Sequence, residues 1–271
     1  PANIFFGTGI PTIIMVLRKN KKDSDVLIID ASKGFEKDGK NNKLRACDIK
    51  RIVDAYKERP EKIKKFARRV SRAEIIQNDY NLNIPRYVDS SEKAESWDIY
   101  ASMFGGIPEA ELQDLSAYWT AFPHLKAALF SPDNEAYCHL NVQNLKNAVL
   151  NHPDVVAFKT AFQNTFGDFD AYLKAALIEG MMELNAAGEE ERLSREIFAR
   201  LAGIPLVDRY AAYQLLDDDW KKIAIDLEIV QTEGFAATKQ VDPNMVLKKD
   251  AEVQDGWVGH VLPFELVQSV K

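Results

Sequence analysis

The chain of 271 residues is long enough for one large domain or two ordinary ones, and its 46% hydrophobic and 28% charged residues are near the globular average. No apolar run approaches the roughly 18 residues of a membrane-spanning helix, and the N-terminus lacks the residue order of a secretory signal, so we expect no membrane contact. The net charge of −6 is divided unevenly, because residues 1–98 carry +6 and residues 99–271 carry −12. A basic N-terminal third predicts contact with nucleic acid, whereas phosphate would repel the acidic remainder.

The cysteines and histidines indicate neither a disulfide nor a metal site. Cys47 and Cys138 stand far apart without a C-x-x-C partner, which predicts reduced, buried thiols and a cytoplasmic protein. The histidines, at positions 124, 139, 152 and 260, do not have the spacing of metal ligands, so we expect no metal.

Two short apolar runs near the N-terminus predict buried β-strands. Pro11–Leu17 (PTIIMVL) and Val26–Ile29 (VLII) are continuous and rich in β-branched residues, as strands covered on both faces are. The charged stretch Arg18–Asp25 indicates a surface turn, so we expect the two strands to form a hairpin or to be near neighbours. After a polar loop, Lys33–Asn42, the apolar residues of Cys47–Tyr56 recur at i, i+3, i+4 and i+7, which predicts an amphipathic helix.

A second helix, Glu61–Val70, is expected after Pro60, which suits a first helical turn. Its basic side chains form either an ordinary solvated face or a stripe that contacts DNA phosphates, and the sequence leaves both open. Asn78–Val88 is expected to be extended, because Ile84 precedes a proline. The residues that would contact the DNA backbone are Lys62, Lys64, Lys65, Arg68 and Arg69.

Beyond Trp97 the sequence favours helices, and only a last segment, Asp255–Leu266, has strand and turn features. Tyr210, Tyr213 and Trp220 would share one helical face, where core packing is the default interpretation and a protein interface is the alternative. The expected helices are Glu109–Phe122, Val142–Leu150, Val155–Phe166, Asp168–Ala187, Ser194–Ala202 and Asp208–Leu227.

The glycines of Phe6–Gly9 (FGTG) raise the question of a nucleotide-binding loop. Such a loop connects a strand to the N-terminus of a helix, whose unpaired amides bind a phosphate or carboxylate. Here only Ala2–Phe5 precedes the glycines, and Pro11 and an expected strand follow. The context therefore argues against a cofactor loop.

Three stretches, PANIFFGTGIPTIIMVLRKNK (1–21), DVLIIDAS (25–32) and NDYNLNIPRYVD (78–89), carry a specific resemblance. They are similar, nearly residue for residue, to the C-terminal part of the modification (M) subunit of type I restriction–modification systems, a gamma-type N6-adenine DNA methyltransferase. LVDRYAAYQLLDDDW (206–220) and GWVGHVLPFELV (256–267) resemble the same subunit in order and character.

The resemblance implies a fold, a division of the chain into two regions, and a set of partners. Residues 1–98 would be an α/β fragment, the C-terminal half of an S-adenosylmethionine-dependent methyltransferase domain with the last strands of its Rossmann-like sheet. Residues 99–271 would be a mainly α-helical assembly region, so that helix dominates overall. The family places an aromatic ring against the flipped target adenine, and the matching candidates are Phe5 and, slightly less favoured, Phe6. The partners would be double-stranded DNA, the specificity (S) subunit, the restriction subunit and, in the complete subunit, S-adenosylmethionine.

The family's parts that bind the methyl donor and orient the adenine have no counterpart here. The Asn/Asp-Pro-Pro-Tyr/Phe motif is missing, its nearest approach being Asp242-Pro243-Asn244. We therefore expect no catalytic or cofactor-binding residue in this chain, and no methylation by the chain alone. The alternative is a non-catalytic DNA-binding or subunit-assembly protein derived from such a subunit. A lone strand pair would also leave an apolar edge, which predicts cover by helices of the chain or a homodimer.

Overall fold

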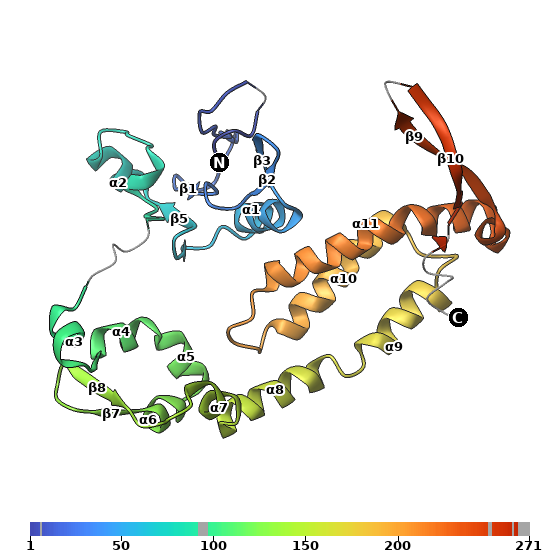
Figure 1. The fold of residues 1–271 in the computed structure, drawn as a ribbon. Helices are drawn as coiled ribbons and strands as arrows, with labels where there is room; N and C mark the ends of the chain where they lie inside the picture. Colours follow the sequence, from blue (N-terminus) through green and yellow to red (C-terminus); the bar gives the residue numbers. More distant parts are fainter. Residues whose placement is uncertain (6, 92–96, 249–250, 262, 265–271) are drawn as a thin grey trace. The chain divides into compact units, whose positions relative to one another are not determined.

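The computed structural model describes residues 1–271 except 6, 92–96, 249–250, 262 and 265–271 (Figure 1). It is a mixed α/β structure, 48% helical and 17% strand, with small antiparallel sheets and a helical C-terminal region. The predicted fold class is therefore confirmed. Backbone contacts divide the chain into Pro1–Ser102 and Met103–Lys271, whereas the functional division into residues 1–98 and 99–271 stays a prediction. No helix in the described ranges is long and apolar enough to cross a membrane.

The main sheet of the first unit is built around β5 (Ala67–Val70). β1 (Val26–Ile29) pairs with one edge of β5 and β4 (Lys62–Ile63) pairs with the other, both antiparallel. In the register of the first pair, Val26 lies opposite Val70. Because side chains alternate along a strand, β1 and β5 each send apolar residues to both faces of the sheet.

Both faces of this sheet are covered, as the apolar composition of Val26–Ile29 predicts. On one face the strands pack against α2 (Arg72–Gln77) and the 3₁₀-helix η1 (Ile84–Arg86). On the other face they pack against α1 (Ala46–Glu58). The first cluster consists of Val26, Ile28, Val70, Ile75, Ile84, Tyr87 and Val88. The second consists of Ile29, Ala31, Ile52, Ala55, Ile63, Phe66 and Ala67.

The ends of α1 follow from its terminal residues, and the helix confirms the prediction for Cys47–Tyr56. In the first turn of α1, Asp48 Oδ2 accepts hydrogen bonds from the backbone N–H of Arg45 at 3.1 Å and from Nε of Arg45 at 2.8 Å. At the other end Arg59 adopts the left-handed conformation, with φ at 48°, and its N–H donates to the Ala55 carbonyl at 3.0 Å.

The prediction of a strand at Pro11–Leu17, and of its hairpin with β1, is wrong. In the described residues this stretch has no strand partner, and β1 pairs with β5 instead. A strand requires a neighbour that satisfies its backbone groups, which a local sequence pattern does not supply. The apolar side chains of the stretch are exposed, with Ile14 at 94%.

The prediction of a helix at Glu61–Val70 is also wrong, since the segment forms β4, a turn and β5. Lys65 has φ at 58°, which a helix does not accommodate, and it makes the turn possible. Ala67 and Val70 are then buried in the clusters on opposite faces of the sheet. The extended stretch expected at Asn78–Val88 is instead a set of turns followed by η1.

The second unit begins with a small antiparallel sheet in the order β6 (Ile107–Pro108), β8 (Tyr137–Leu140), β7 (Phe130–Pro132). The predicted helix Glu109–Phe122 forms, but it is interrupted at Leu115. α3 (Ile99–Phe104) spans the boundary between the two units. The helices that follow it are α4 (Glu109–Asp114), α5 (Ser116–Ala121), α6 (Leu125–Leu129), α7 (Leu145–Leu150) and α8 (Pro153–Thr165). The buried residues Phe122, Leu125, Leu129 and Val155 form its core.

The remaining elements are α9 (Phe169–Leu173), a π-helix (Lys174–Glu179), α10 (Ala186–Leu201), α11 (Arg209–Glu233), a 3₁₀-helix (Phe235–Lys239), β9 (Val241–Lys248) and β10 (Ala251–Gly259). Trp220 is buried with Leu193 between α10 and α11, which confirms core packing for this residue. Tyr213 Oη donates to Glu190 at 2.7 Å. β9 and β10 form an antiparallel hairpin. Residues 255–259 belong to β10, as their predicted strand features indicate, whereas β9 was not predicted.

His260 joins the end of this hairpin to α11 and makes the stability of the unit depend on pH. Its Nδ1 lies 2.6 Å from Asp242 Oδ2, and its Nε2 lies 3.4 Å from Glu233 Oε2. The hydrogen bond with Asp242 raises the pKa of His260 above the ordinary value of 6.5, with burial opposing and Glu233 adding to the rise. The stabilisation is therefore fully present below that ordinary value and is lost as the pH rises through the raised pKa.

We expect the free energy of unfolding of the native chain to decrease as the pH rises from about 5.5 to about 8.5. In His260→Gln this decrease should be smaller. Urea denaturation at the two pH values, with an NMR titration of the imidazole, measures both quantities. His139→Gln, at an exposed histidine of β8, is the control. A His260 midpoint at or below the ordinary histidine value would contradict this.

Candidate nucleic-acid interface

The described residues of the N-terminal stretch, 2–5 and 7–9, form the N-terminal turn and include one predicted substrate-contacting residue. Asn3 and Gly7 have φ at 53° and 78°, and the Thr8 N–H donates to the Phe5 carbonyl at 3.4 Å. The side chain of Phe5 is 59% exposed. Phe6, the second candidate, lies outside the described residues. No helix follows the turn in residues 10–17, so the glycines do not lead into a helix N-terminus, as the sequence context indicated.

The turn is anchored on a hairpin formed by β2 (Glu36–Asp38) and β3 (Asn41–Lys43). The backbone N–H of Asn42 donates to the Asn3 carbonyl at 2.8 Å, and its Nδ2 donates to the Ala2 carbonyl at 2.7 Å. Asn42 is 6% exposed. Sequence reasoning missed this residue, because it lies in a polar loop whose composition gives no sign of a distant contact.

Asp30 connects the end of β1 to the segment that follows η1. Its Oδ2 accepts a hydrogen bond from Ser90 Oγ at 2.5 Å, and its Oδ1 accepts one from the Ser32 N–H at 2.9 Å. Burial alone would raise the pKa of Asp30, but the hydrogen bonds from Ser90 and Ser32 outweigh burial and lower it below the ordinary 3.8. The sequence signal that could have pointed to Asp30 is its position, since a carboxylate stands directly after the apolar run Val26–Ile29.

The five predicted DNA-contacting residues divide into two groups. Lys62, Lys64 and Lys65 are exposed on β4 and the turn after it. Arg68 and Arg69, on β5, are half-buried and paired with carboxylates. The guanidinium of Arg68 donates to both oxygens of Glu74 at 2.9 Å, and Nη2 of Arg69 lies 2.6 Å from Glu61 Oε2.

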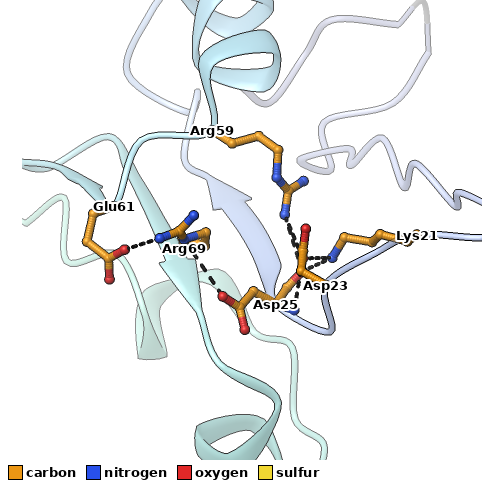
Figure 2. A network of polar contacts seen from close by, with 6 residues as sticks. All are labelled: Lys21, Asp23, Asp25, Arg59, Glu61 and Arg69. Atoms are coloured by element: carbon orange, nitrogen blue, oxygen red, sulfur yellow. Dashed lines mark hydrogen bonds and ion pairs between the residues drawn. The ribbon is translucent and has the colours of Figure 1, made fainter.

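Arg69 belongs to a polar network of three cations and three carboxylates (Figure 2). Its Nε lies 3.8 Å from Asp25 Oδ2. Asp23 Oδ1 lies 2.9 Å from Lys21 Nζ and 3.4 Å from Arg59 Nη2, and the hydrogen bond from Lys21 contributes most to lowering the pKa of Asp23. The network joins the stretch before β1 to the end of α1 and to β5. Its charges balance internally, so it adds little to the field that attracts phosphate.

Comparison with known proteins identifies the part of the chain that carries these features. Residues 1–96 match the N-6 DNA Methylase family. The methylase subunit of the type I restriction enzyme MpnII from Mycoplasma pneumoniae is 38% identical over 100 residues, and that of MjaVII from Methanocaldococcus jannaschii is 40% identical over 105 residues. Each match covers 36% of this chain and 18% of the relative.

A solved structure, the methyltransferase subunit of a type I restriction–modification system from Streptococcus thermophilus, is 53% identical over 34% of this chain and 19% of that chain, with a TM-score of 0.33. The family match and the two relatives confirm the resemblance to type I methylase subunits for residues 1–96, which we call the methylase segment. This family consists of S-adenosylmethionine-dependent methylases. The resemblance drawn for residues 206–220 and 256–267 stays a prediction.

The methylase segment contains the turn, Asn42, Asp30 and the basic residues. Within the described residues, no group of three or more histidine, cysteine or carboxylate side chains is arranged to hold a metal ion. The segment thus presents an exposed aromatic ring on a turn that is hydrogen-bonded to the β2–β3 hairpin, and exposed lysines on β4 and the turn after it.

Replacing Asp30 tests the link between β1 and the segment after η1. We expect Asp30→Ala to lower the free energy of unfolding by about 1.5–3 kcal/mol, because hydrogen bonds to a charged group are removed. The lowered pKa of Asp30 gives stability that is present above its ordinary pKa and is lost as the pH falls through the folded-state value.

Urea denaturation of the native and variant chains from about pH 3 to about pH 7 measures both effects. Asp38→Ala, on the exposed strand β2, is the matched control and should change little. Equal stability of Asp30→Ala and Asp38→Ala at neutral pH would contradict the assigned role.

Proposed function

We propose that this chain is the C-terminal portion of an adenine-N6 DNA methylase subunit of a type I restriction–modification complex. The complete subunit would transfer a methyl group from S-adenosylmethionine to N6 of a flipped adenine. The observation that carries the proposal is the match of residues 1–96 to the N-6 DNA methylases, with relatives that are named type I methylase subunits.

The exposed apolar surface of the first unit supports a role as part of a larger sheet. Pro11–Leu17 is exposed along its length, and the apolar face of α1 is exposed at Ile49, Val53 and Tyr56. A surface of this kind marks a site of association, and an α/β domain covers its strands and helices with one another. We propose that the donor-binding half of the methylase sheet, which residues 1–271 do not contain, covers this surface.

Substrate contact is assigned to the N-terminal turn. Phe5 is exposed, and its anchored backbone would hold the ring still against an adenine that has left its neighbours in the duplex. Phe6 is the second candidate. The sequence contains neither the Asn/Asp-Pro-Pro-Tyr/Phe motif nor a glycine loop expected between a strand and a helix, so we propose that the chain holds no catalytic or cofactor-binding residue and is inactive alone.

The partners follow from the same assignment. Lys62, Lys64 and Lys65, whose side chains are exposed, would contact the phosphates of double-stranded DNA. Arg68 and Arg69, which are bonded to Glu74 and Glu61, would do so by exchanging these carboxylates for phosphate. Residues 99–271, which are acidic and largely helical, would contact the specificity and restriction subunits. A homodimer that covers Pro11–Leu17 is the alternative for the isolated chain.

A second candidate function is that of a non-catalytic DNA-binding or assembly protein derived from a methylase subunit. The missing methyl-donor and adenine-orienting motifs favour it. Both candidates share the DNA contact and the partner subunits, and they differ only in whether a methyl donor is bound and used.

Calorimetric titration of S-adenosylmethionine into this chain and into a full-length subunit that contains it tests the proposal. We expect only the full-length subunit, and not this chain, to bind S-adenosylmethionine, because the proposed donor site lies outside residues 1–271. Tight binding by this chain would contradict the assignment of its parts. Failure of the full-length subunit, assembled with its specificity subunit, to bind the donor or methylate DNA would favour the non-catalytic alternative.

The lysines of the β4–β5 turn give a separate prediction. We expect replacement of Lys62, Lys64 and Lys65 by Gln in the assembled complex to reduce the slope of log K against log salt by up to about 0.9 for each DNA phosphate that is no longer neutralised. DNA binding measured by fluorescence anisotropy at several salt concentrations gives the slope. Lys146→Gln, on α7, is the control, and an unchanged slope in the triple variant would remove these lysines from the interface.

A further inference from the structure

We infer that Asn42 is a positioning residue, which fixes the N-terminal turn so that Phe5 meets the target base. The inference rests on the proposed function, since the position of Phe5 matters for catalysis only if a flipped adenine contacts it. Asn42 stands on β3, 40 positions along the chain from Ala2, and its two hydrogen bonds join the turn to the β2–β3 hairpin.

The anchor is specific to the turn. In the described part of the chain, the hydrogen bonds that tie Ala2–Gly9 to another element both come from Asn42. The remaining ones, from the Thr8 N–H to the Phe5 carbonyl and from the Ile10 N–H to Thr8 Oγ1, shape the turn itself. The shape of the turn and its place on the unit therefore have separate causes, and Asn42 determines the place.

The chemistry of the contact requires a buried carboxamide at this position. Nδ2 donates to a carbonyl oxygen, and Oδ1 is buried without a hydrogen-bond partner among the described residues. A buried polar atom without a partner costs stability, so the side chain is not simply the best filler of this space. An aspartate would have the same shape but would place a second oxygen against the Ala2 carbonyl.

The distance along the chain makes the anchor effective. A side-chain substitution removes the bond from Nδ2 to Ala2, while the bond from the backbone N–H of Asn42 to Asn3 remains. Phe5 is three residues beyond Ala2, and each residue spans at most about 3.6 Å, so a turn loosened at Ala2 has room to move the ring by about 1 Å or more. A misplacement of about 1 Å at a reacting group can lower a rate by about 100-fold. Asn42 thus lies outside the substrate contact and still controls it.

Hydrogen exchange of the chain, measured by mass spectrometry on the peptide that contains Phe5 and Thr8, tests the anchor without any catalysis. We expect faster exchange in Asn42→Ala and Asn42→Asp than in the native chain, with unchanged circular dichroism. Asn41→Ala, at the neighbouring position of β3, is the matched control. Unchanged exchange in both Asn42 variants would overturn the anchor.

Single-turnover methylation by the complete complex tests the positioning role. We expect Asn42→Asp and Asn42→Ala to lower the rate by about 10- to 100-fold with DNA affinity within about twofold of native. The double variant with Phe5→Ala should be no slower than Phe5→Ala alone, because both act through one ring.

Native rates in the Asn42 variants, or independent effects of the two substitutions, would overturn the inference. A native complex that fails to methylate would instead overturn the proposed function, and the exchange result would still decide the anchor.

Discussion

The first unit depends on the antiparallel pairing of β1 with β5. This pairing places Ile28 and Val70 in one cluster and Ile29 and Ala67 in the other, so both faces of a small sheet become buried against helices. Burial on two faces gives the short strands most of their stabilisation, since about 25 cal/mol is gained for each Å² of apolar surface removed from water. Two of the segments that carry the resemblance to methylases, residues 25–32 and 78–89, are joined at this sheet.

The same pairing determines how the polar residues meet. Asp30, at the end of β1, receives the hydroxyl of Ser90, and Arg69 on β5 comes within reach of Asp25. The basic character of the first unit is therefore partly neutralised inside the unit at Arg68 and Arg69, whereas Lys62, Lys64 and Lys65 are exposed on β4 and the turn after it. A count of charges along the sequence does not distinguish these two groups, because the distinction depends on which carboxylate lies beside which cation.

Pro11–Leu17 and one face of α1 are apolar, as core elements are, but their side chains are exposed. A sheet of three short strands offers too little area to cover them. This mismatch, together with a match that covers 18% of the length of its relatives, is consistent with a segment whose fold is completed by further sheet. The side chain of Phe5 is exposed as well, but the backbone of its turn is hydrogen-bonded to Asn42, and this difference supports the proposed contact of Phe5 with the base.

The sequence by itself located the helices α1, α8 and α11, although α11 continues to Glu233, beyond its predicted end at Leu227. Patterns that identify a helix act within a few positions of one another. The sequence also determined the methylase resemblance, through stretches that are continuous in the chain. Only the tertiary structure decided that Glu61–Val70 is a strand pair, that Pro11–Leu17 has no strand partner among the described residues, and that Asn42 and Asp30 hold segments 40 and 60 positions away. Strand pairing and buried hydrogen bonds join residues distant in sequence, and local periodicity carries no information about which distant partner is chosen.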